Sequence, residues 1–250
     1  MAAGLNTRIL VFENKEALSR AVADRFVEVV QECCASGNSC SVALSGGVTP
    51  QRCYALLGTD RYRNQVDWTA IHVFWADERS VPPVDNDSNY KLAYDLLLSV
   101  VPIPEKNIHR VKGEKSPIEA AQQYESEILA FFGSRVPVFD LVVLGAGIDG
   151  HTASLFSASA ALREHVRFAV PVIMEPPQLS RVTLTLPVLN NANHVLVLAS
   201  GQPKALVVQE IFENGNARQY PAGLVRPVHG SLEWFIDREA ATLSRSLLKE

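Results

Sequence analysis

The sequence predicts an α/β protein with a mostly parallel, doubly wound sheet flanked by helices. Short apolar runs of strand length alternate with segments of helical periodicity through most of the chain, and glycine-rich or polar residues follow several of the runs. With 47% hydrophobic and 20% charged residues among 250, the chain can bury both faces of such a sheet. We find no internal repeat or domain boundary, so we expect residues 1–250 to form a single domain.

The first half of the chain alternates helix and strand. Apolar residues at helical spacing predict a helix over 15–35, ended by Gly37, and 41–44 is a short apolar strand closed by glycines. A helix is expected from about 50 to 57. The other elements expected in this half are a strand over 71–75, helices over 90–100 and 118–132, and a strand over 139–144.

The second half continues with strands. Residues 182–186 alternate with period two, which is typical of a strand with one buried face. The other expected elements are strands over 168–174 and 195–199, a helix from about 204, and a strand over 233–236 that leads into a helix. Strands separated by helices predict a Rossmann-like sheet covered on both faces.

Charge and hydropathy exclude two classes of partner. A net charge of −4 and a pI near 5.9 disfavour nucleic acid, which needs clustered Lys and Arg. No apolar stretch approaches the ~18 residues of a membrane-spanning helix. The first residues lack the basic and apolar regions of a signal peptide, so we expect a cytoplasmic protein. Nothing in the sequence defines the oligomeric state, and a monomer is compatible with it.

The four cysteines do not have metal-site spacing. They are Cys33, Cys34, Cys40 and Cys53, and none belongs to a C-x-x-C unit. We therefore expect reduced core thiols rather than metal ligands.

Four polar segments follow strands and are expected at one edge of the sheet. Because ligands bind at the carboxyl ends of parallel strands, these segments can converge on one crevice although they are far apart in sequence. They are residues 45–50, 76–79, 145–151 and 200–204.

The first segment has the composition of an anion-binding loop. Gly46 and Gly47 after Ser45 allow close backbone approach, and Thr49 is a good N-cap for the helix that follows. A tight turn that binds nothing is the alternative. Lys204 lies near the start of another expected helix, where the dipole disfavours a cation unless an anion is present. A solvated lysine is the other interpretation, but the glycine loop at the same edge favours phosphate contact.

Residues 145–150 match G-x-G-x-x-G, the pattern of a dinucleotide-binding turn, and His151 follows directly. Against a nicotinamide enzyme, Asp149 would repel a pyrophosphate, the match lies mid-chain, and no acidic residue is well placed to bind a ribose. We expect His151 at the start of a helix, where the dipole favours the neutral imidazole that can take a proton from water. Asp149 would orient the ring or hold the water.

Three charged residues end the strand over 71–75. The cluster of Asp77, Glu78 and Arg79 is compatible with a solvated loop, an ion-pair network or a binding site. Arg79 is suited to a phosphate or to a developing oxyanion. Arg181 stands at the beginning of its strand, and a neighbouring antiparallel segment could bring it to the same site.

Together these motifs resemble the 6-phosphogluconolactonase family of the glucosamine-6-phosphate isomerase/6-phosphogluconolactonase superfamily. The resemblance covers nearly the whole chain, in family order, and its most specific part is Asp-Gly-His-Thr-Ala-Ser-Leu-Phe. The matching segments are 44–50, 77–82, 88–90, 149–156, 181–185, and Gly201 with Lys204.

The resemblance implies hydrolysis of 6-phosphoglucono-δ-lactone without metal or cofactor. His151 would be the base, with a phosphate pocket built from the Gly46-Gly47 loop, Lys204 and Arg181. The motif residues Ser45, Thr49, Asp77 and Glu78 are then expected at the substrate as well. The chain departs from the family pattern at Val48 and Ser157, which affects loop geometry rather than a catalytic group.

Two other functions remain as alternatives. Glucosamine-6-phosphate deaminases share an Asp-Gly-His turn, but the acidic residue expected after it is absent here, and Arg79 replaces an expected Tyr. A non-catalytic sugar-phosphate sensor would bind the same ligand without turnover, although such modules usually lack the base or carry a DNA-binding segment.

Overall fold

The computed structural model describes residues 6–35, 37–133 and 135–248. Its centre is a six-stranded parallel sheet in the spatial order β1-β9-β8-β5-β2-β3. Its strands are β1 (Asn6–Phe12), β2 (Cys40–Leu44), β3 (Ile71–Trp75), β5 (Leu141–Gly145), β8 (His194–Ala199) and β9 (Ser231–Asp237). This confirms the predicted fold class.

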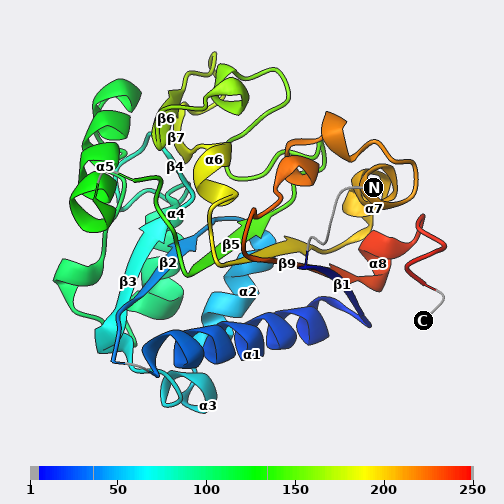
Figure 1. Cartoon of the computed structure of the whole chain (residues 1–250), viewed down its shortest axis with the longest axis horizontal. Coiled ribbons are helices and arrows are strands. Elements are labelled where there is room, and N and C mark those ends of the chain that lie inside the picture. The colour runs from blue at the N-terminus through cyan, green and yellow to red at the C-terminus, as the bar shows by residue number, and fades with distance from the viewer. Residues whose placement is uncertain (1–5, 36, 134, 249–250) are drawn as a thin grey trace.

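Helices flank the sheet, and the long ones follow the predicted periodicity. In α1 (Lys15–Cys34) the apolar residues are buried on the side facing the sheet, and Asn14 caps its first turn through a hydrogen bond from Ala17 N. Figure 1 shows α1 along one face of the sheet, while α5 lies on the other side beside a second, smaller sheet. The other helices are α2 (Val48–Leu57), α3 (Asp60–Arg63), α4 (Asn89–Ala93), α5 (Pro117–Phe132), α6 (Leu186–Leu189), α7 (Ala205–Phe212) and α8 (Arg238–Ala241).

The smaller sheet is antiparallel and was not anticipated as a separate unit. It has the order β4-β7-β6, formed by β4 (Asp77–Arg79), β6 (Ala169–Val172) and β7 (Arg181–Leu184). The sequence indicated only a charged strand end at β4, because Asp-Glu-Arg has low strand propensity. Its pairing with β7 places Arg79 opposite Arg181.

The order of the parallel strands places a topological switch between β2 and β5. From β2 the chain adds β3 on one side, whereas β5, β8 and β9 extend the sheet on the other. A crevice opens at such a point because the loops that leave the two strands run to opposite faces. The loops after β2 and β5 are the two glycine-rich segments identified in the sequence.

Other elements differ from expectation in detail. Strand β1 was not predicted, and the helix expected over 90–100 is α4 followed by a π-helical turn over Tyr94–Leu98. No helix in 6–35, 37–133 or 135–248 combines the length and apolar character needed to cross a membrane. The signal-peptide argument concerns mainly residues 1–5, which lie outside the described residues, and the cytoplasmic location stays a prediction.

Candidate active site

A crevice of about 600 Å³ lies at the carboxyl edge of the central sheet, over the switch between β2 and β5. All four polar segments identified from the sequence contribute to its wall. The predicted site residues that line it are Ser45, Gly46, Gly47, Thr49, Asp77, Arg79, His151, Arg181 and Lys204. Glu78 and Asp149 do not line it and act through their neighbours.

His151 and Asp149 form a close pair at the crevice. Nδ1 of His151 lies 2.5 Å from Oδ1 of Asp149, and the histidine ring packs against Phe156. A carboxylate at this distance favours the tautomer with its proton on Nδ1, which leaves Nε2 with a free lone pair. Burial acts to raise the pKa of Asp149, but the hydrogen bond and charge of His151 outweigh it and hold that pKa below its ordinary value.

The helix expected to begin at His151 is absent, and that prediction was wrong. Residues 151–159 form turns, with an isolated bridge between Thr152 and Leu155. The expected dipole of a helix beginning at His151 therefore does not act on the imidazole. The carboxylate of Asp149 is the group that orients it.

The glycine-rich loop over 145–150 makes room for this pair. A Cβ atom on Gly147 would lie 2.1 Å from His151 Nδ1 and 2.6 Å from Asp149 Oδ1. Gly150 has a φ of +76° and passes against Tyr220, so it too excludes a side chain. Gly147 and Gly150 of the G-x-G-x-x-G pattern therefore shape the turn that carries His151 and Asp149.

The loop after β2 presents the amino end of α2 to the crevice. The helix begins at Val48 with Gly47 as its N-cap, so the expectation that Thr49 caps it was wrong. Gly47 has a φ of +102°, and no side chain caps the first turn. The backbone N–H groups of this turn have no partner within the helix and can bind an anion.

Asp77 connects several walls of the crevice. Its carboxylate accepts hydrogen bonds from Ser154 Oγ at 2.6 Å and Asn89 Nδ2 at 3.3 Å, and it lies 3.9 Å from Arg181 Nη1. Asn89 was not proposed as a site residue, although it belongs to a quoted motif. Its Oδ1 is buried without a hydrogen-bond partner in the described chain, directly beneath Gly46, where a Cβ would meet it at 1.8 Å.

Glu78 has a supporting position. Its buried carboxylate accepts hydrogen bonds from Ser88 Oγ and from the backbone N–H groups of Arg79, Asn89 and Tyr90. Burial raises the pKa of Glu78 despite these bonds. The sequence placed Glu78 at the substrate, but the structure directs it toward the loop that carries Asn89.

The three cationic residues that the sequence predicts at the site, Arg79, Arg181 and Lys204, all line the crevice, and Lys15 lines it as well. Nε of Arg79 and Nε of Arg181 are buried without a hydrogen-bond partner among the described residues, and Arg181 also lies over the Phe156 ring. Burial lowers the pKa of Lys204, with an opposing effect of the Asp149 charge. Buried donors without partners are costly, and an anion in the crevice would satisfy them.

The loop that carries Lys204 is held by a residue that the sequence did not indicate. Both carboxylate oxygens of Asp237 accept from Gly201 N, and Oδ1 also caps α8 through Ala240 N. Asp237 stands at the end of β9, next to β8 in the sheet. Only the pairing of these strands brings it to the crevice.

Fold and crevice together define an α/β protein that can hold an anionic ligand beside a histidine–carboxylate pair. Residues 13–234 match the family model described as glucosamine-6-phosphate isomerases/6-phosphogluconolactonase. The chain therefore belongs to this family, and within it to the 6-phosphogluconolactonases.

Named relatives align with nearly the whole chain and support its place among the 6-phosphogluconolactonases. The chain is 38% identical to human 6-phosphogluconolactonase, covering 97% of this chain and 96% of the relative. It is also 38% identical to the probable 6-phosphogluconolactonase 1 of Arabidopsis thaliana, over 94% of this chain and 92% of the relative. The solved 6-phosphogluconolactonase from Trypanosoma cruzi superposes with a TM-score of 0.87 at 30% identity, covering 97% of this chain and 98% of that one.

Proposed function

We propose that the chain hydrolyses 6-phospho-D-glucono-1,5-lactone to 6-phospho-D-gluconate in the oxidative pentose phosphate pathway, with His151 as general base on water. The observation that carries the proposal is the His151–Asp149 pair facing a crevice with unpartnered guanidinium nitrogens. A lactone that carries a phosphate needs both features: a base for water and cations for its negative charges.

The pair of arginines supports an anionic ligand independently of the histidine. Arg79 and Arg181 are directly opposite each other on β4 and β7, and like charges in this arrangement repel. An anion bound nearby offsets that repulsion. Planar guanidinium groups match the oxygens of a phosphate or of a developing oxyanion.

In the proposed mechanism His151 Nε2 takes a proton from a water molecule. The resulting hydroxide adds to C1 of the lactone, and Arg79 stabilises the negative charge that develops on the carbonyl oxygen. When the C1–ring oxygen bond breaks, the imidazolium returns its proton to the departing ring oxygen, which becomes a hydroxyl group. Asp149 keeps the ring in the required tautomer throughout.

The phosphate of the substrate would occupy the part of the crevice next to the start of α2. The free N–H groups at the start of α2, together with Lys204 and Arg181, form the proposed phosphate pocket, with Ser45 and Thr49 beside it. Asp77 and Glu78 would hold this wall in place through Asn89, Ser154 and Arg181.

The direct test is acid release from freshly generated 6-phosphoglucono-δ-lactone, with spontaneous hydrolysis subtracted. We expect His151→Ala to lose about 10²- to 10⁴-fold in kcat, the contribution of a general base. His165→Ala, at an exposed histidine outside the crevice, is the matched control and should keep wild-type activity.

Full activity in His151→Ala would overturn the role of the histidine. If the wild type does not accelerate lactone hydrolysis, and the wild type and His151→Ala bind 6-phosphogluconate equally well, the chain is a sugar-phosphate sensor instead. Release of ammonia from glucosamine 6-phosphate would identify a deaminase.

A further inference from the structure

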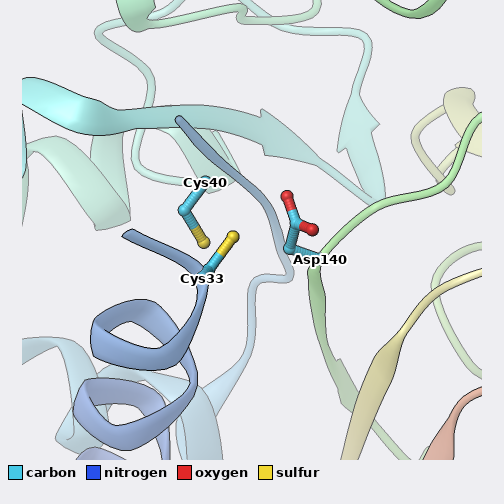
Figure 2. A group of neighbouring side chains, drawn as sticks. All are labelled: Cys33, Cys40 and Asp140. Atoms are coloured by element: carbon cyan, nitrogen blue, oxygen red, sulfur yellow. The ribbon is translucent and has the colours of Figure 1, made fainter. Parts of the chain in front are cut away.

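A second cluster of chemically reactive side chains lies away from the crevice. Cys33, Cys40 and Asp140 each offer one ligand atom, and these atoms all lie within 4.8 Å of one another. Figure 2 shows the two sulfur atoms pointing toward each other with the carboxylate beside them. Within 6–35, 37–133 and 135–248, this is the one group of three or more such residues with metal-binding geometry.

Three elements meet at this cluster. Cys33 is in the last turn of α1, Cys40 is the first residue of β2, and Asp140 directly precedes β5. The crevice lies at the carboxyl ends of β2 and β5, so the cluster occupies the opposite edge of the same two strands. A ligand here would contact none of the residues that line the crevice.

One residue of the cluster is buried, and the other two can be reached from the surface. Cys40 is fully buried, whereas Cys33 and Asp140 line a surface hollow of about 530 Å³ that also includes Asn193 and His194. Asp140 is fixed by hydrogen bonds from Ser41 N and Ser41 Oγ to its Oδ2, both 2.8 Å. Hydrogen bonds to a carboxylate from neighbouring residues orient it for metal binding. The hollow gives a small ion and its water a route to the sulfurs.

The donor set has a clear chemical preference. Two sulfurs and one carboxylate oxygen match the ligands of Zn²⁺ and similar thiophilic cations, whereas Mg²⁺ and Ca²⁺ require oxygen ligands. Burial, with the nearby Asp140 charge, raises the pKa of Cys33 to about 11, and burial also raises that of Cys40. Without a cation both sulfurs are therefore thiols, which are slow to react in redox exchange.

Although the spacing of the cysteines in the sequence favours thiols without a metal, we propose that Cys33, Cys40 and Asp140 form a binding site for one thiophilic divalent cation of the Zn²⁺ class, with water from the hollow as the fourth ligand. Binding displaces one proton from each thiol, so two protons are released for each cation bound. The bound cation would join the end of α1 to the beginnings of β2 and β5. Because the unfolded chain lacks this geometry, the cation should stabilise the folded protein.

Cd²⁺ is a suitable probe, because thiolate-to-cadmium charge transfer absorbs in the ultraviolet and reports sulfur ligation directly. The full-length protein would be reduced, stripped with a chelator and titrated without oxygen. We expect an absorption that saturates at one Cd²⁺ per chain, disappears on addition of excess Zn²⁺, and accompanies a rise in Tm. Lactone hydrolysis provides a separate readout, which fails or succeeds independently of this site.

Variants distinguish the proposed ligands from other thiols. Cys33→Ser and Cys40→Ser should lose the saturating absorption and the Tm rise, and Asp140→Asn should weaken binding. Cys34→Ser is the matched control, because Cys34 neighbours Cys33 on the same helix but is outside the cluster. It should bind like the wild type.

Other outcomes would overturn the site. The proposal fails if the wild-type protein, with all four thiols reduced, shows no cadmium–thiolate absorption. It also fails if Cys33→Ser keeps the full absorption, or if Cys34→Ser loses as much absorption as Cys33→Ser. Circular dichroism of each metal-free variant shows whether it folds. If Cys40→Ser is unfolded, the variants of the two accessible residues, Cys33→Ser and Asp140→Asn, still test the proposed site.

Discussion

Gly147 illustrates how one backbone position controls the proposed catalytic pair. The side chains of His151 and Asp149 occupy the space where a Cβ of residue 147 would stand. The Gly147 N–H also donates to the carbonyl of His151 at 2.7 Å, which closes the turn. The requirement for glycine is therefore steric and local.

We predict that Gly147→Ala separates His151 from Asp149 and lowers kcat. Loss of the oriented base should cost about 10²-fold or more. Gly145→Ala is the comparison: Gly145 also lines the crevice, but its added Cβ meets nothing within 4 Å, so the variant should keep the His151–Asp149 pair and lose far less. Steady-state kinetics of both variants would check this, and equal losses in the two would contradict the steric argument.

At the scale of elements, helices α1 and α2 are joined by a charged contact. Glu16 in the first turn of α1 accepts from Arg52 Nε of α2 at 2.7 Å and from Arg20 Nε at 3.1 Å. The hydrogen bond from Arg52, together with that from Arg20, lowers the pKa of Glu16 from 4.5 to about 2, against the opposing effect of burial. Because α2 follows the glycine loop of the proposed phosphate pocket, this contact also supports the position of that loop.

We predict that Glu16→Gln lowers the free energy of unfolding slightly at neutral pH, since exposed ion pairs contribute little. The pKa of Glu16 is depressed in the folded protein, so its contribution is complete above pH 4.5 and falls as the pH drops toward 2. In thermal melts, the difference in Tm between wild type and variant should become smaller as the pH is lowered from 7 to 3. A difference that grows on acidification would contradict the assignment.

At the scale of the whole molecule, the crevice depends on two sheets. The parallel sheet supplies the glycine loops, Lys204 and the His151–Asp149 pair, and the small antiparallel sheet supplies Arg79 and Arg181. A ligand in the crevice would contact both sheets at once. Its binding energy should therefore appear as stability of the folded chain.

We predict that 6-phosphogluconate raises the Tm of the wild-type protein. At a hundredfold excess over Kd the stabilisation is about 2.7 kcal/mol, or about 5–10 °C for a chain of this size. Lys204→Ala should show a smaller shift at the same concentration, whereas Lys115→Ala, an exposed lysine outside the crevice, should match the wild type. An undiminished shift in Lys204→Ala would remove that residue from the phosphate pocket.

Local patterns in the sequence are sufficient to predict the fold class, the main helices and strands, and the four polar segments that supply much of the crevice wall. These follow from local information: hydrophobic periodicity, glycine positions, and the rule that loops at one edge of a parallel sheet converge. Local information also leads to one wrong prediction, because the segment after Gly150 forms turns and not the expected helix.

The contacts between groups that are distant in sequence depend on the tertiary structure. Asp237 holds the Lys204 loop because β9 pairs with β8, Arg181 faces Arg79 because β7 pairs with β4, and Asp140 approaches Cys33 and Cys40 because β5 lies beside β2. Such contacts depend on strand order and register, which nearest-neighbour patterns in a chain do not encode. The residues were visible in the sequence, but their partners were set by the packing of the sheets.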